Sequence, residues 1–96
     1  MKVGVARVTL RIGESQSLKH KRHVVKSIAA RVRERFDVAI AESAHQDLWQ
    51  LAELGVAYVS NEAGHADAVL ARVIAFIEAD AGEAEVTGVE TEVLEF

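Results

Sequence analysis

Cysteine and proline are both absent from the 96 residues, and glycine occurs only six times. The lack of cysteine excludes disulfide bonds, thiolate metal sites and cysteine nucleophiles. The lack of proline and the scarcity of glycine argue against a long flexible linker. Because the hydrophobic fraction of 50% is enough for one core, we expect a single domain over residues 1–96.

Long apolar runs are also missing, and none approaches the length of a membrane-spanning helix. The N-terminal segment alternates between apolar and polar residues, so it lacks the apolar core of a signal peptide. We therefore expect a cytoplasmic protein that has no membrane partner.

Cations are scarce in the second half of the chain, although the net charge of the whole is only −4. Residues 1–47 hold ten Lys/Arg and five Asp/Glu, a balance of +5. Residues 48–96 hold one Lys/Arg and ten Asp/Glu, a balance of −9. Such a split indicates either a basic binding face or an attraction between the two halves on folding.

Hydrophobic periodicity divides the chain into strands, with a spacing of two, and helices, with a spacing of three and four. The predicted strands cover residues 2–12, 36–41, 51–60 and 84–96. The first predicted helix covers residues 17–35, with Ser15 or Ser17 as its N-cap. The second begins after Asn61 as N-cap and ends near Gly82.

The resulting βαββαβ order predicts an α+β, ferredoxin-like sandwich. Two right-handed βαβ units interleave into a four-stranded antiparallel sheet of order 4-1-3-2, with both helices on one face. Because the first and last strands are neighbours, we expect Arg7 and Arg11 to face Glu90 and Glu92 on the open side. The strand at 51–60 is apolar at both parities, which leaves open which parity faces the helices.

Four segments resemble, in order and at compatible spacing, the YlxP-like bacterial proteins of unknown function. These segments are Ser17–Arg22, Phe36–Glu42, His45–Gln50 and Gly55–Asn61. The resemblance implies a ferredoxin-like fold and no established enzyme activity, cofactor or catalytic residue. Genes of this family often neighbour those of translation initiation factor two and ribosome-binding factor A, which implies, by association, a translation-related partner. This chain has His20 where the family often has an acid that would complete a capping box.

The basic first helix is the strongest feature outside the core, with seven of the eleven Lys/Arg. A helical projection places Lys19, Arg22, Lys26 and Arg33 within an arc of about 60° beside the apolar stripe. Such a stripe can follow a phosphate backbone. The candidate nucleic-acid or partner-binding residues are Lys19, Lys21, Arg22, Lys26 and Arg33. The alternative interpretation is a solvated face, partly paired with the acidic second half.

Aromatic residues make up only 5% of the chain, and none flanks the basic stripe in the sequence. Any contact with RNA should therefore be mostly electrostatic. We expect Trp49 to anchor the hairpin end against the sheet, with a partner contact as the alternative. Tyr58 is the lone aromatic where RNA-recognition modules stack bases on central strands, which excludes readout of that kind. An apolar open sheet face would mark an interface, for which Trp49 and Tyr58 are the candidate residues.

Histidines and carboxylates form no recognisable metal or catalytic motif. His20 and His23 lie three apart on one helix, but two imidazoles without a nearby carboxylate make a poor metal site. His45 and Asp47 are the only candidate acid–base pair, and loop hydrogen bonding is the simpler role for them. The sequence has neither a nucleophile elbow nor a phosphate loop. We expect no metal, no cofactor and no catalysis.

The sequence therefore favours a non-enzymatic interaction module. The leading hypothesis is association with the ribosome, structured RNA or a translation-related protein through the basic first helix. The alternative is a domain that self-associates through its open sheet face and has no nucleic-acid role.

Overall fold

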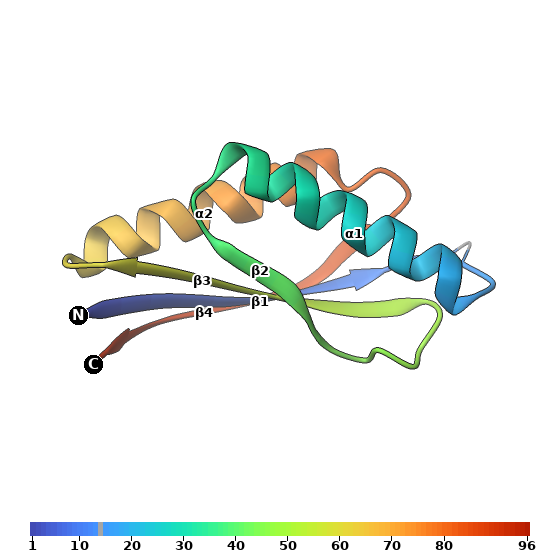
Figure 1. Ribbon diagram of the computed structural model, residues 1–96, viewed down its shortest axis with the longest axis horizontal. Coiled ribbons are helices and arrows are strands. Elements are labelled where there is room, and N and C mark those ends of the chain that lie inside the picture. The colour runs from blue at the N-terminus through green and yellow to red at the C-terminus, as the bar shows by residue number, and fades with distance from the viewer. Residues whose placement is uncertain (14) are drawn as a thin grey trace.

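The computed structural model describes residues 1–13 and 15–96, and its elements follow the predicted order. They are β1 (Lys2–Arg11), α1 (Leu18–Arg35), β2 (Ala39–Ala44), β3 (Leu51–Ser60), α2 (Ala63–Asp80) and β4 (Glu85–Glu95). The antiparallel sheet has the order β2-β3-β1-β4, which is the predicted 4-1-3-2 read from the other edge. Both helices cover one face of this sheet (Figure 1), so the predicted fold is confirmed.

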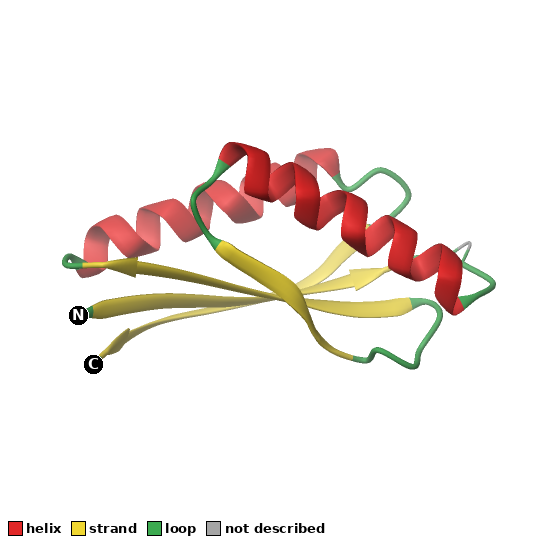
Figure 2. Cartoon of the chain, viewed as in Figure 1, coloured by secondary structure: helices red, strands yellow, loops and turns green. Residues whose placement is uncertain are grey.

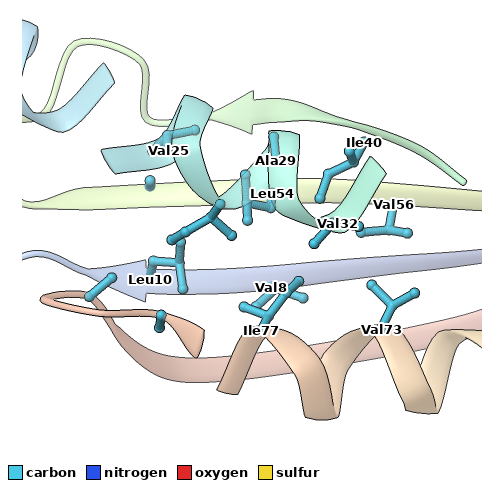
Figure 3. Packing of buried hydrophobic residues seen from close by; sticks show 14 of the residues in the cluster. Val8, Leu10, Val25, Ala29, Val32, Ile40, Leu54, Val56, Val73 and Ile77 are labelled. Atoms are coloured by element: carbon cyan, nitrogen blue, oxygen red, sulfur yellow. The ribbon is translucent and has the colours of Figure 1, made fainter. Parts of the chain in front are cut away.

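The core lies between the helices and the even-numbered side chains of β1. Val8 and Leu10 are fully buried there because alternate residues of a strand point to one face. Neighbouring Leu54 of β3, Val32 of α1 and Val73 of α2 pack against them (Figure 3). Burying one such side chain contributes about 1.5–3 kcal/mol, so this layer is a large source of stability.

The parity of β3 is now determined. Leu54 and Val56 point into the core, whereas Ala57 and Val59 point to the open face of the sheet. Val59 is 61% exposed, because no described element covers that face. The second apolar face of this strand is therefore a surface feature.

The start of the second strand was predicted three residues too early. Phe36 is the C-cap of α1, and its N–H donates to Val32 O at 2.9 Å. Its ring packs edge-to-face on Phe76 with the centroids 5.8 Å apart. The apolar alternation at 36–40 therefore joins a helix cap to a strand that begins at Ala39.

The helix starts agree only in part with the predictions. Ser17 is the N-cap of α1, and its Oγ accepts from the His20 N–H at 3.1 Å. The N-cap of α2 is Glu62, without a side-chain cap bond, and not Asn61. Ser60 Oγ accepts from the Glu62 N–H at 3.1 Å. A serine outside the helix therefore fixes the backbone where α2 begins.

Candidate functional site

Four exposed cations of α1 form a row along one side of the helix, and three of them line a groove against β2. Lys19, Arg22, Lys26 and Arg33 are all exposed, and we call these four residues the cationic stripe. Within the described residues, none of the four forms an ion pair with a carboxylate. Arg33 donates to Ile40 O at 2.6 Å and so covers part of the free edge of β2.

Two further cations of α1 are held by partners elsewhere. Arg31 Nε lies 2.6 Å from Asp80 Oδ2, and its NH2 group donates to Asp80 O at 2.8 Å. The Arg35 guanidinium sits 5.0 Å above the centre of the Phe76 ring, at cation–π distance. These two residues fit the solvated, partly paired interpretation of the helix, unlike the stripe.

Lys21 does not belong to any binding surface, so its prediction as a binding residue is wrong. Its side chain is 0% exposed. Its Nζ donates to His45 O at 2.7 Å and to Leu51 O at 3.2 Å. The same atom lies 2.9 Å from Glu42 Oε2. Lys21 is therefore a structural lysine that ties α1 to the connection between β2 and β3.

The sequence did contain a signal for this burial. The apolar face of α1 includes Leu18 and Val25, and Lys21 lies three residues after the first and four before the second. Residues at that spacing share one helix face. A lysine in the gap of an apolar stripe must therefore either extend outward or find buried partners.

A groove of about 220 Å³ runs between α1 and β2. Arg22, Lys26 and Arg33 line it together with the apolar Val25 and Ala29. On the β2 side it is lined by Ala41 and Glu42. Three of the four stripe residues thus converge on one groove with an apolar floor, which suits an anionic ligand with a flat or aliphatic part.

Trp49 does not anchor the hairpin, which corrects the sequence expectation. Its side chain is 53% exposed, and that of Leu48 beside it is 48% exposed. The loop at residues 45–50 that carries them lies beside the start of α1 (Figure 2), where Lys21 holds both of its ends. The loop that carries this exposed aromatic residue therefore lies beside the first turns of the basic helix.

Tyr58 is not on the open sheet face where an interface role was predicted. It lies on the helix side of β3, with its hydroxyl oxygen 3.1 Å from His65 Nε2 and the two rings edge-to-face. Its interface role therefore has no support from its position.

The open face of the sheet carries an apolar row instead. The strand register places Val3 between Val59 of β3 and Leu94 of β4, and Leu94 is 42% exposed. A shallow hollow of about 610 Å³ continues from Val5 across the small side chains of β3 and β2. We call Val3, Val59 and Leu94 the apolar row.

Charged residues share this open face with the apolar row. Arg7 lies 3.7 Å from carboxylate oxygens of both Glu53 and Glu90, so its predicted pairing with β4 is confirmed. Arg11 stands opposite Glu85 in the register and not opposite Glu92. The face is therefore neither uniformly apolar nor of one sign of charge.

The side chains considered for acid–base catalysis or metal binding do not assemble into a site within the described residues. His45, in the left-handed region at φ 64°, and Asp47 are both exposed, and no hydrogen bond joins their side chains in the described structure. His20 Nε2 lies 3.1 Å from Glu83 Oε2. No group of three metal-ligating side chains occurs within residues 1–13 and 15–96. In the same residues, neither helix has the length and apolar character of a membrane span.

The fold and this site define a ferredoxin-like α+β domain with a cationic helix and an uncovered sheet face. The chain belongs to a family described as proteins of unknown function (DUF503), whose model matches residues 3–91. The uncharacterized protein YlxP of Bacillus subtilis (strain 168) is 41% identical over 76 residues, which are 79% of this chain and 83% of that protein. The family that the sequence resembled is thereby confirmed.

A solved structure agrees with the fold alone. The de novo designed protein Foldit4 matches with a TM-score of 0.54 and 15% identity, over 100% of this chain and 99% of its own.

Proposed function

We propose that this protein is a non-catalytic interaction module that binds structured RNA through the cationic stripe. The observation that carries the proposal is the division of charge on α1. Within residues 1–13 and 15–96, Lys19, Arg22 and Lys26 project into solvent without a carboxylate partner, whereas Lys21 and Arg31 are engaged within the fold. Long flexible cations that stay unpaired are suited to neutralising phosphates.

The dimensions of the stripe suit a nucleic-acid backbone. Lys19 and Arg33 are fourteen residues apart, which is roughly 21 Å along a helix axis. A row of that length reaches several successive phosphates of one strand. Because the whole chain carries a net charge of −4, the RNA should approach α1 and be repelled by the acidic remainder.

Salt dependence tests this proposal directly. Binding of a fluorescently labelled RNA hairpin would be measured by anisotropy between about 50 and 200 mM salt. Neutralising about three phosphates predicts that the affinity falls by roughly 40-fold over this range. The double variant Arg22→Glu/Lys26→Glu should lose at least tenfold at the lower salt concentration.

A matched control separates this site from general charge. Arg11→Glu/Arg72→Glu makes the same change in net charge at exposed positions on β1 and α2. This control should bind RNA within about threefold of the wild type, and thermal unfolding should show that both variants remain folded. The proposal is wrong if the two double variants bind alike or if the hairpin shows no binding at low salt.

The apolar row supports a second candidate function, which is self-association through the open sheet face. The occupant would be a second copy, since this face carries both Arg7 and its acidic neighbours Glu53 and Glu90, and two copies could exchange these pairs. Sedimentation of the wild type and of Val59→Lys would test it. A dimer that the lysine breaks supports this function, whereas a monomer at high protein concentration contradicts it.

A further inference from the structure

Trp49 is an exposed aromatic side chain on the loop at residues 45–50, which Lys21 holds against the first turns of α1. Together with Leu48, Gln50 and Leu51 it lines a shallow hollow of about 440 Å³. An indole that is half in water leaves its flat apolar face available to a ligand. Neither the proposed electrostatic contact nor the core makes use of this ring.

The loop that carries Trp49 is fixed at several points. Ile12 N–H donates to Gln50 O at 2.9 Å, and Leu48 N–H donates to His45 O at 3.0 Å. Lys21 holds the carbonyl groups of His45 and Leu51 at its two ends. A ring presented on such a loop is preorganised, so little conformational entropy is lost when a ligand stacks on it.

The position of this loop brings two kinds of RNA contact together. Lys21 places the loop beside the first turns of α1, where the stripe begins with Lys19 and Arg22. Cations that track a backbone and an aromatic ring that stacks bases are the two components of single-strand recognition. RNA is read at its unpaired bases because these can be turned out and stacked.

We infer that an unpaired base stacks on Trp49 while the adjoining stem lies along the cationic stripe. The ligand is therefore RNA with a stem next to unpaired nucleotides, rather than a continuous duplex. This inference rests on the proposed function and adds the kind of RNA that is preferred. It adds a stacking contact to the mostly electrostatic binding expected from the sequence.

The fluorescence of Trp49 gives a direct readout, because it is the only tryptophan of the chain. The wild type would be titrated with an RNA hairpin whose loop has four adenines and with a blunt duplex of equal phosphate number. The hairpin should quench the emission at saturation, since a stacked base contacts the indole. The duplex should bind through the stripe and leave the emission nearly unchanged.

Variants of the loop distinguish stacking of a base on Trp49 from recognition of the RNA shape alone. Trp49→Ala should weaken binding of the hairpin by about tenfold, within the range known for the loss of one stacked base. It should change binding of the duplex by less than about twofold. Trp49→Phe, which keeps an aromatic face, should restore most of the affinity. Gln46→Ala, at an exposed position of the same loop that does not line the hollow, should behave as the wild type.

The outcomes distinguish this inference from the function on which it rests. If Trp49→Ala binds the hairpin as the wild type does, while Arg22→Glu/Lys26→Glu loses both RNAs, the stacking inference is wrong and the stripe remains. If Trp49→Ala abolishes a dimer and leaves binding of RNA intact, the loop is a protein interface and the inference is overturned. If neither RNA binds at low salt, both proposals fail together.

Discussion

Lys21 is a buried charge whose partners hold α1 against the connection between β2 and β3. An ammonium group without water is stable only when it is paired and hydrogen-bonded. Two carbonyl oxygens and the carboxylate of Glu42 meet that requirement. Glu42 Oε2 is itself buried and accepts no well-aligned hydrogen bond in the described structure, so the nearby ammonium is what balances its charge.

Replacing Lys21 by methionine should therefore be costly. Lys21→Met leaves the Glu42 carboxylate without its cation and two carbonyl groups without their donor, which predicts a loss of about 3–5 kcal/mol in the free energy of unfolding. Urea unfolding measures this loss. Lys19→Met, on an exposed position of the same helix, should change stability by less than about 0.5 kcal/mol.

The double variant Lys21→Met/Glu42→Leu tests the cause. Removing both charges should recover part of the loss, because the unpaired carboxylate is gone while the two carbonyl groups still lack a donor. A cost for Lys21→Met no larger than that of Lys19→Met would contradict this role.

At the scale of the elements, sequence periodicity predicts the structure of β1 correctly but fails for the hairpin between β2 and β3. The alternation of β1 follows directly from one buried and one open face, so its residues are predictable. The spacing of the stripe is likewise a property of one helix. The placement of the loop that carries Trp49 depends instead on hydrogen bonds from Lys21 and Gln50, which join segments far apart in the chain. No local periodicity in the sequence carries that information. The start of β2 was mispredicted at Phe36 because this helix cap continues the apolar alternation of the strand.

The packing of α2 on β1 gives the second prediction of stability. A Cβ added at Gly4 would lie 3.0 Å from Leu70 Cδ1 and 3.2 Å from Ala66 Cβ, whereas one at Gly88 would meet only Thr9, at 3.6 Å. Gly4→Ala should thus force α2 away from the sheet and cost about 1–3 kcal/mol. Gly88→Ala should be neutral or stabilise by up to about 1 kcal/mol, because it restricts the unfolded chain.

Thermal unfolding distinguishes these two alanine variants. For a domain of this size, 1 kcal/mol corresponds to about 4–8 °C in Tm, so Gly4→Ala should unfold clearly below Gly88→Ala. Equal Tm values would mean that Leu70 and Ala66 adjust without cost.

Across the whole molecule, the fold interleaves the strands of the two oppositely charged halves of the chain and places the helix of each half toward a different edge of the sheet. The strand order leaves β2 and β4 at the two edges, with α1 beside β2 and α2 beside β4. The Arg31–Asp80 and His20–Glu83 contacts join the two sides. The cationic stripe stays outside these contacts. The charge split seen in the sequence therefore produces some internal pairing and also a distinct basic face.

The two ends of the chain also meet in space (Figure 1), and there a charge pair makes stability depend on pH. Lys2 Nζ lies 2.6 Å from Glu95 Oε1, and the N-terminal ammonium group lies 3.4 Å from Oε2. The hydrogen bond from Lys2, followed by that from the N-terminal ammonium, holds the pKa of the Glu95 carboxyl below its ordinary value of 4.5.

A carboxyl whose pKa is lower in the folded state stabilises that state at a pH above its unfolded pKa, and the contribution is lost as the pH falls through the folded value. Glu95→Gln should therefore lower Tm slightly at about pH 6, and this difference from the wild type should disappear as the pH falls below the lowered pKa of the folded carboxyl. Glu92→Gln, which removes another exposed carboxylate from β4, controls for the change in net charge. An NMR titration of the Glu95 carboxyl gives the direct measurement. A midpoint at or above 4.5 would contradict the pairing, because the ammonium groups can favour only the ionised form.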